Sequence, residues 1–289
     1  MGGAFFMMVK STGKIFNLGG LEVRRLLPRK KFDSIGPIIF FDHMGPGLIE
    51  PQKPINIRPH PHIGLATLTY LFDGELTHED SLKNYITLLP GGTNLMVSGS
   101  GIVHSERTKS DTGFTINGLQ FWIGQPIELQ NEMGRFSHWP EIPRFDIDGV
   151  NAELIFGSYK NYHADQFNDA FVLSLFFSNQ EILNLEFDDE NEIAFYSVSG
   201  NCKVNESSIS SNELAELNSK SIKIVAENNS RVIIFGGKPL GYQPHLKWNF
   251  ASHDPQKIEE AAERWRNQQF PKIENDPEYI PLPENFYET

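Results

Sequence analysis

The stretch RPHPHIGLATLTYLFDGE, residues 58–75, places His60 and His62 two positions apart, just before a run of alternating side chains. Alternation with a period of two is typical of a β-strand, where residues two apart point the same way and lie about 6.6 Å apart. Two imidazoles side by side suit neither a hydrophobic core nor a solvated loop. The stretch therefore favours a strand that presents two metal ligands, although such a pair alone is also common on surface loops.

A second pair, His104 and Glu106, has the same spacing in SGSGIVHSERT, residues 98–108. The chain between the two pairs is long enough for a few strands, which could bring them together across a small barrel. Three imidazoles and one carboxylate form a mixed nitrogen and oxygen set that suits iron, manganese, cobalt, nickel, copper or zinc better than calcium or magnesium. Four protein ligands on an octahedral ion leave two positions open, so the set predicts a catalytic site rather than a structural one.

Short apolar runs separated by turn residues continue through the first 240 positions, and the chain holds 24 glycines and 18 prolines. This spacing, with no long helical period, predicts an all-β sandwich or barrel. The run TYLFDGELTHED (69–80) also resembles AFYSVSGNCKVNE (194–206) in its order of aromatic strand, glycine turn and polar strand. The pattern predicts a duplicated β-domain with its boundary near residues 137–165.

One helix is predicted, over PQKIEEAAERWRNQQF (255–270), near the end of the chain. Asp254 can cap its first turn, and Pro271 stops it. Beyond it, the proline-rich tail is predicted to be extended and to lie across the body of the protein.

The formal net charge of −12 and the pI of about 5.2 disfavour direct binding to nucleic acid, although residues 24–31 form a local basic segment. The single cysteine, Cys202, excludes an intrachain disulfide and fits a reducing compartment. The early apolar run, residues 4–9, is too short for a signal peptide or a membrane span. These features predict a soluble, cytoplasmic protein with no nucleic-acid or membrane partner.

Four segments together resemble the pirin family of the cupin superfamily: FFDHMGPG (40–47), residues 58–82, PGGTNLMVSGSGIVHSERT (90–108) and GLQFWIG (118–124). The resemblance implies a bicupin, two jelly-roll β-barrels in tandem over residues 1–140 and 141–289, with a short C-terminal helix and tail in the second part. It also implies one metal ion in the N-terminal barrel, with iron(II) expected and manganese, cobalt, nickel, copper or zinc as alternatives. The ligands that it implies are His60, His62, His104 and Glu106.

The sequence departs from the family pattern at three points. Ala66 stands where cupins often place a glutamate after the second histidine, and Ile63 and Leu65 replace the arginine and phenylalanine of many pirins. No histidine lies between His163 and His245. We therefore expect the second barrel to lack the metal site.

Several other side chains are interpreted as structural. His43 could contact the ligand shell or the substrate, but a structural role is favoured. His78 is interpreted as a polar residue at a strand end. Phe40, Phe121 and Trp122 are predicted to pack the barrel rather than to stack on a ligand.

The resemblance implies a quercetinase, which opens flavonols with dioxygen and releases carbon monoxide. The expected partners are then a flavonol-like aromatic substrate and dioxygen, with Glu106 as a metal ligand that also takes the hydroxyl proton. One alternative is a metal-dependent co-regulator that binds other proteins and is switched by the metal's oxidation state. Another is a different cupin reaction on a small acid, which needs a tight pocket with an arginine rather than a roomy apolar cleft.

Overall fold

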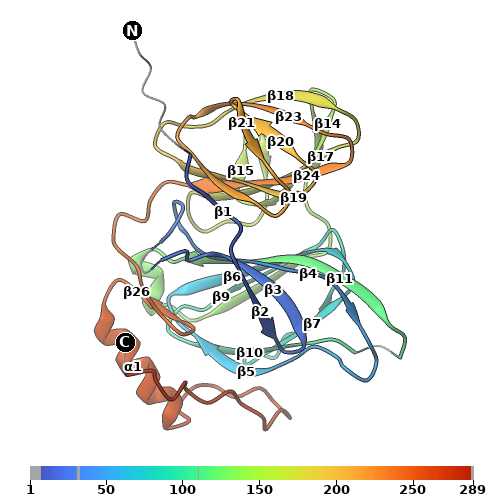
Figure 1. The fold of residues 1–289 in the computed structure, drawn as a ribbon. Coiled ribbons are helices and arrows are strands. Elements are labelled where there is room, and N and C mark those ends of the chain that lie inside the picture. The colour runs from blue at the N-terminus through green and yellow to red at the C-terminus, as the bar shows by residue number, and fades with distance from the viewer. Residues whose placement is uncertain (1–7, 31–32, 110, 288–289) are drawn as a thin grey trace. The chain divides into compact units, whose positions relative to one another are not determined.

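The computed structural model describes residues 8–30, 33–109 and 111–287 of the chain. Lys31 of the basic segment and residues 4–7 of the early apolar run lie outside the described residues. Strands dominate, so the all-β prediction is confirmed (Figure 1). None of the helices among the described residues is long and apolar enough to span a bilayer.

Contacts divide the chain into two units, each of which contains one seven-stranded and one four-stranded antiparallel sheet. One unit, the first barrel, comprises Ile15–Phe32, Ile39–Glu141 and Leu240–Thr289. The other unit, the second barrel, comprises Met1–Lys14, Asp33–Ile38 and Ile142–Pro239.

The strands of the first barrel do not follow chain order across either sheet. From edge to edge, the larger sheet contains β12 (Arg135–Trp139), β9 (Thr93–Val97), β6 (Leu65–Asp73), β11 (Phe114–Gly124), β4 (Ile38–Ile49), β3 (Leu21–Leu27) and β2 (Lys14–Leu18). The smaller sheet contains β5 (Asn56–His62), β10 (Ile102–Arg107), β7 (Leu76–Asp80) and β8 (Tyr85–Leu88). The unit also contains a 3-10 helix, η1 (Ile127–Asn131), the hairpin of β25 (His245–Lys247) and β26 (Phe250–Ser252), and the helix α1 (Pro255–Arg266).

The second barrel repeats this arrangement. Its larger sheet contains β1 (Lys10–Ser11), β22 (Leu214–Leu217), β19 (Glu192–Ser199), β24 (Ser230–Gly237), β17 (Ala170–Phe177), β14 (Val150–Phe156) and β13 (Arg144–Ile147). Its smaller sheet contains β18 (Glu181–Glu186), β23 (Ser221–Ala226), β20 (Cys202–Val204) and β21 (Ser207–Ile209). The short strands β15 (Ser158–Tyr159) and β16 (Tyr162–His163) pair with each other.

The strand orders bear out the duplication predicted from the two similar runs. The small sheets run β5-β10-β7-β8 and β18-β23-β20-β21, so β5 to β11 correspond in order to β18 to β24. The strands equivalent to β5 and β10 bury aliphatic side chains in the second core: Leu183, Leu185, Ile222 and Ile224. The second barrel therefore fills with hydrocarbon the positions at which the first carries histidines.

The two repeats differ at one sheet edge. In the first barrel β12 pairs with β9, whereas the equivalent place beside β22 is taken by β1, near the start of the chain. The chain that follows β24 instead joins the first barrel. The second barrel also includes the internal segment Asp33–Ile38, so strand pairing and packing rather than chain order decide which unit a segment joins. The division into residues 1–140 and 141–289 stays a prediction.

Gly64 allows the late hairpin to pack close to the histidine strand. Its φ of +66° belongs to the left-handed region that favours glycine, and a Cβ there would collide with the carbonyl oxygen of Ala251. The Ala251 amide donates to the Ile63 carbonyl at 3.0 Å, and Ile63 forms a parallel bridge with Phe250. Residues just after His62 are therefore held by a segment that is far away in sequence.

The C-terminal helix α1 spans Pro255–Arg266, and the Asp254 carboxylate accepts from the Gln256 amide as its cap. It ends four residues before the predicted end, because Gln268 adopts a left-handed conformation (φ 53°) and the Gln269 amide returns to the Arg264 carbonyl. The described tail beyond it forms no strand and turns at residues 274–275 and 284–287, so it is not extended throughout. Its Ile280 amide donates to the Pro59 carbonyl of β5, so the tail does lie against the first barrel.

Candidate metal centre and adjoining cleft

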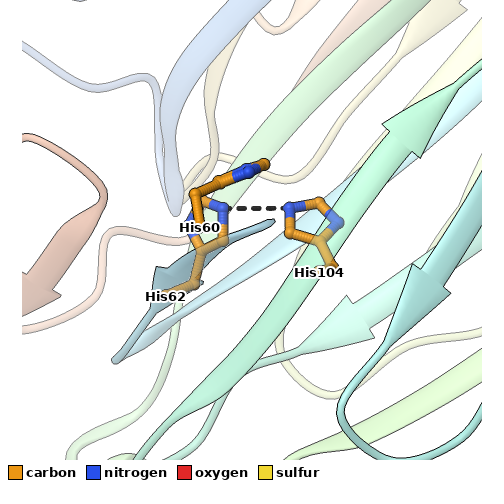
Figure 2. A group of neighbouring side chains, drawn as sticks. All are labelled: His60, His62 and His104. Atoms are coloured by element: carbon orange, nitrogen blue, oxygen red, sulfur yellow. Dashed lines mark hydrogen bonds between the residues drawn. The ribbon is translucent and has the colours of Figure 1, made fainter. Parts of the chain in front are cut away.

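His60, His62 and His104 meet on the inner face of the small sheet of the first barrel (Figure 2). His60 and His62 come from β5 and His104 comes from β10. The two strands pair antiparallel, with His60 opposite His104. The register shifts between His104 and Glu106, a bulge of the kind often found beside functional sites. Within the described residues, these three histidines are the one group of three or more potential ligands whose atoms lie within 4.8 Å of one another.

The three imidazoles are neutral at neutral pH. Burial lowers the pKa of His60 to about 4, and the backbone carbonyl of Arg58 only partly opposes this effect. Burial, together with the neighbouring imidazoles, lowers the pKa values of His62 and His104 well below 6.5. Neutral imidazole is the form that binds metals, so protons do not compete for these nitrogens near neutrality.

The geometry of the three histidines fits a divalent transition-metal ion. The Nε2 atoms of His62 and His104 face each other at 3.1 Å (Figure 2), close to the spacing of about 3 Å between adjacent nitrogens each about 2.1 Å from one ion. The Nδ1–H group of His60 donates to the Arg58 carbonyl at 2.9 Å, which leaves its Nε2 lone pair free for a ligand bond. Metal-binding histidines commonly fix their other nitrogen in this way.

Glu106 lies beside the histidine cluster but outside the group of ligand atoms within 4.8 Å. Its side chain is buried, and its Oε1 accepts from the Gln120 Nε2 at 2.9 Å. Burial raises the pKa of Glu106 to about 7, and the Gln120 hydrogen bond acts in the opposite direction. Trp122 Nε1 approaches the Gln120 Oε1 at 3.4 Å, which orients the amide with its nitrogen toward the carboxylate.

A cleft of about 490 Å³ opens onto His60 and Glu106. One wall is aromatic: Phe40 and Trp122 stack with ring centroids 3.9 Å apart. The cleft is within the usual size range of small-molecule sites. Phe40 and Trp122 pack in a buried cluster, as the sequence interpretation expected, and they also line the cleft. Phe121 is fully buried against Phe41.

An arginine also lines the cleft, but its charge is matched. Arg25 forms a bidentate pair with Asp42 at 3.0 and 2.9 Å, and its guanidinium lies 4.4 Å from the Phe40 ring centroid. The remaining wall contains Leu246, Trp248 and Ile280 of the late chain segment. No periodicity in the sequence could assign this distant segment to the cleft.

The structure moves His78 from a strand end to the interior, next to the candidate ligands. It is only 5% exposed, it packs flat on Phe136 with ring centroids 4.4 Å apart, and its Nδ1 lies 3.3 Å from His104 Nδ1. The sequence does contain a pattern that points to His78, because His78 and Asp80 have the same two-residue spacing as the other two pairs. His43, in contrast, pairs with Asn117 at 2.9 Å and is not among the residues lining the cleft.

Comparison with known proteins identifies the family. The sequence model of the pirin family matches residues 20–123, and that of the pirin C-terminal cupin domain matches residues 173–271. A pirin-like protein of Caulobacter vibrioides is 34% identical over 285 residues, which cover 93% of this chain and 96% of that protein. The chain belongs to the pirin family.

Solved structures agree with this assignment. A crystal structure of quercetin 2,3-dioxygenase from Acinetobacter baumannii has 28% identity and a TM-score of 0.88, and the match covers 96% of each chain. A bacterial pirin from Escherichia coli, solved in complex with nickel(II), shares the fold at 21% identity and a TM-score of 0.65, over 81% of this chain and all of that one. The predicted bicupin architecture of this pirin-family chain is thereby confirmed.

Proposed function

We propose that this pirin-family protein is a mononuclear metal dioxygenase that opens flavonols by a quercetin 2,3-dioxygenase reaction. His60, His62, His104 and Glu106 would hold one divalent ion, with iron(II) as the first candidate. The observation that carries the proposal is the three-histidine cluster beside a roomy, aromatic-walled cleft and a buried carboxyl group. The Acinetobacter baumannii enzyme of that name, at 28% identity over nearly the whole chain, supports the same reaction.

The side chains of the cleft have distinct chemical roles in this proposal. When bound, a divalent ion would supply Lewis acidity that favours ionisation of a chelated flavonol hydroxyl. Glu106 is the carboxyl group that lines the cleft beside the histidines, and it would accept the hydroxyl proton as general base. Phe40, stacked with Trp122 and covered by the Arg25 guanidinium, gives the cleft a rigid apolar side that would keep water away from the reacting carbons.

The size of the cleft favours a flavonol over a small acid. A small carboxylate would need a tight pocket with an available cation, whereas this cleft is roomy and Arg25 is already engaged by Asp42. The planar guanidinium, Phe40 and Trp122 instead form a stacked wall suited to a multi-ring substrate.

The proposed function is tested by metal analysis followed by an aerobic assay. Protein purified without added metal is reconstituted with iron(II) and incubated with quercetin and other flavonols, with dioxygen uptake and carbon monoxide release measured together. We expect turnover of flavonols and none of flavones that lack the 3-hydroxyl group. A fully metal-loaded protein that turns over no flavonol would contradict the proposal and favour the metal-switched protein-binding role.

Proton release on metal binding should reveal whether Glu106 is a ligand. At about pH 6 a carboxyl group with a pKa of about 7 is mostly protonated, while the three histidines are already neutral. Metal binding through the carboxylate should therefore release roughly one proton at about pH 6 and few at about pH 8. Calorimetric titration in buffers of different ionisation enthalpy measures this number.

The matched control for this titration is Glu106→Gln, which should bind metal more weakly and release almost no proton at either pH. Wild-type protein that also releases none at about pH 6 would show that Glu106 keeps its proton and does not ligate the ion.

A further inference from the structure

A chain of buried polar groups continues from His104 away from the cleft. On the strand next to β10, Asp80 lies opposite His104 and His78 lies opposite Glu106. His78 Nε2 is 3.0 Å from the Asp80 Oδ2, and His78 Nδ1 is 3.3 Å from His104 Nδ1. The proposed reaction gives no role to His78 or Asp80, although both are at least 95% buried.

Asp80 is fixed as a hydrogen-bond acceptor. Burial raises its pKa, but hydrogen bonds from His78 and Asn84 outweigh this effect, so that the pKa is lowered below its usual value. Its Oδ1 accepts from the Leu82 amide at 2.8 Å and from the Asn84 amide at 3.1 Å. The Asn84 side chain donates to both carboxylate oxygens. An ionised carboxylate has no proton to donate, so its partner His78 must be the donor.

The donor role of His78 toward Asp80 also decides which nitrogen of His104 carries a proton. A neutral imidazole carries one N–H donor and one acceptor nitrogen. An imidazolium donates from both nitrogens, so the constraint holds for a neutral His78 ring. If neutral His78 donates from Nε2 to Asp80, its Nδ1 is an acceptor, and His104 must then donate from Nδ1. The Nε2 atom of His104 is left with its lone pair directed at the cluster, where it faces His62 Nε2 at 3.1 Å.

We propose that Asp80 and a neutral His78 are a positioning pair that fixes His104 in the Nδ1–H tautomer, so that its Nε2 lone pair is presented to the metal. The inference rests on the proposed function in that it assumes His104 to be a ligand. A metal-binding histidine usually donates directly to a carboxylate or a carbonyl group. Here a second imidazole, that of His78, lies between His104 and the Asp80 carboxylate. Stacking of the His78 ring on Phe136 holds the intermediate ring in the required plane.

The tautomers can be read directly in the metal-free protein. In histidine-labelled protein, two-bond ¹⁵N–¹H correlation spectra distinguish Nδ1–H from Nε2–H rings. We expect His104 in the Nδ1–H form and His78 in the Nε2–H form. Wild-type His104 in the Nε2–H form would overturn the proposal, whether or not the protein binds metal or turns over a flavonol.

The Asp80→Asn variant should reverse the hydrogen-bond donor and acceptor roles of His78 and His104. Two backbone amides donate to Oδ1, so the oxygen of the introduced amide must take that place and its NH₂ group must face His78. His78 would then accept at Nε2 and donate from Nδ1, which drives His104 to the Nε2–H form. Metal affinity, measured by competition with a chelator, should fall roughly 10- to 100-fold.

A second pair of variants separates positioning from packing. His78→Asn offers an amide oxygen to His104 Nδ1 without any link to Asp80, whereas His78→Leu offers no acceptor. We expect His78→Asn to keep the His104 tautomer and most of the metal affinity, and His78→Leu to lose both. Equal losses in the two variants, with His104 still in the Nδ1–H form, would assign the pair a purely structural role.

Internal controls come from the same spectra. His43 and His138 hydrogen-bond to Asn117 and Asn94, and both should keep their tautomers in every variant. If Asp80→Asn does not fold, the wild-type spectrum still decides the proposal. If the wild-type protein shows the expected tautomers but binds no metal, the proposed function fails while the tautomer chain stands.

Discussion

The His104→Ala variant should purify almost free of metal, whereas the wild-type chain should carry one ion. Removing this imidazole takes away the partner that faces His62 at 3.1 Å and breaks the only three-residue ligand group among the described residues. Changes to the outer partners of metal ligands cost 10- to 100-fold in affinity, so loss of a ligand should cost on the order of 100-fold or more. Elemental analysis of protein purified without added metal measures the content.

His138→Ala is the matched control for this variant. His138 lies in β12 of the same barrel, hydrogen-bonds to Asn94 and is not part of the three-histidine group, so the control should keep its full metal content. Two equivalents of tightly bound metal that persist in His104→Ala would contradict a single site and would point to the second barrel, where we propose that no metal binds.

The Glu106→Gln variant should lose flavonol turnover by roughly 10² or more, even after metal is restored. The amide keeps the size of the side chain and an oxygen that can accept from Gln120, so the barrel should still fold. It removes the negative charge and the group that takes the proton. Substrate binding should suffer less than turnover, because the three histidines still hold a chelating ion. Steady-state kinetics at matched metal content give the two effects separately.

Glu79→Gln makes the same chemical change on the neighbouring strand β7, at a position between His78 and Asp80 that faces the other side of the sheet. It should leave turnover unchanged. Full metal occupancy with undiminished turnover in Glu106→Gln would remove Glu106 from proton transfer, although it could still be a ligand.

Much of this fold follows from local patterns in the sequence. Alternation with a period of two placed His60 with His62 and His104 with Glu106, and the repeated strand and turn order indicated the duplication. Asp254 marked the start of the helix, because capping depends on neighbouring residues alone. The pirin resemblance added the ligand set and the reaction, which no spacing could provide.

The part that local patterns could not predict depends on strand pairing. His78 and Asp80 have the same spacing as the other pairs, but only the register of β7 against β10 brings them to His104. Gln120 and Trp122 also lie two apart, and their roles depend on Glu106 in a different strand. Register between distant strands is set by tertiary packing, which a single sequence does not reveal.

The late hairpin and tail have a consequence for how the protein is made. Ile280 and Trp248 line the cleft, yet both are synthesised after the entire second barrel. At about 5–20 residues per second, a ribosome needs on the order of ten seconds or more to travel from Glu106 to Ile280. During that interval the histidines can already be paired across β5 and β10 while one side of the cleft is still missing. If the proposed site binds an ion, a nascent chain would thus meet that ion before this side of the cleft is complete, and the order of translation would provide a period for metal loading.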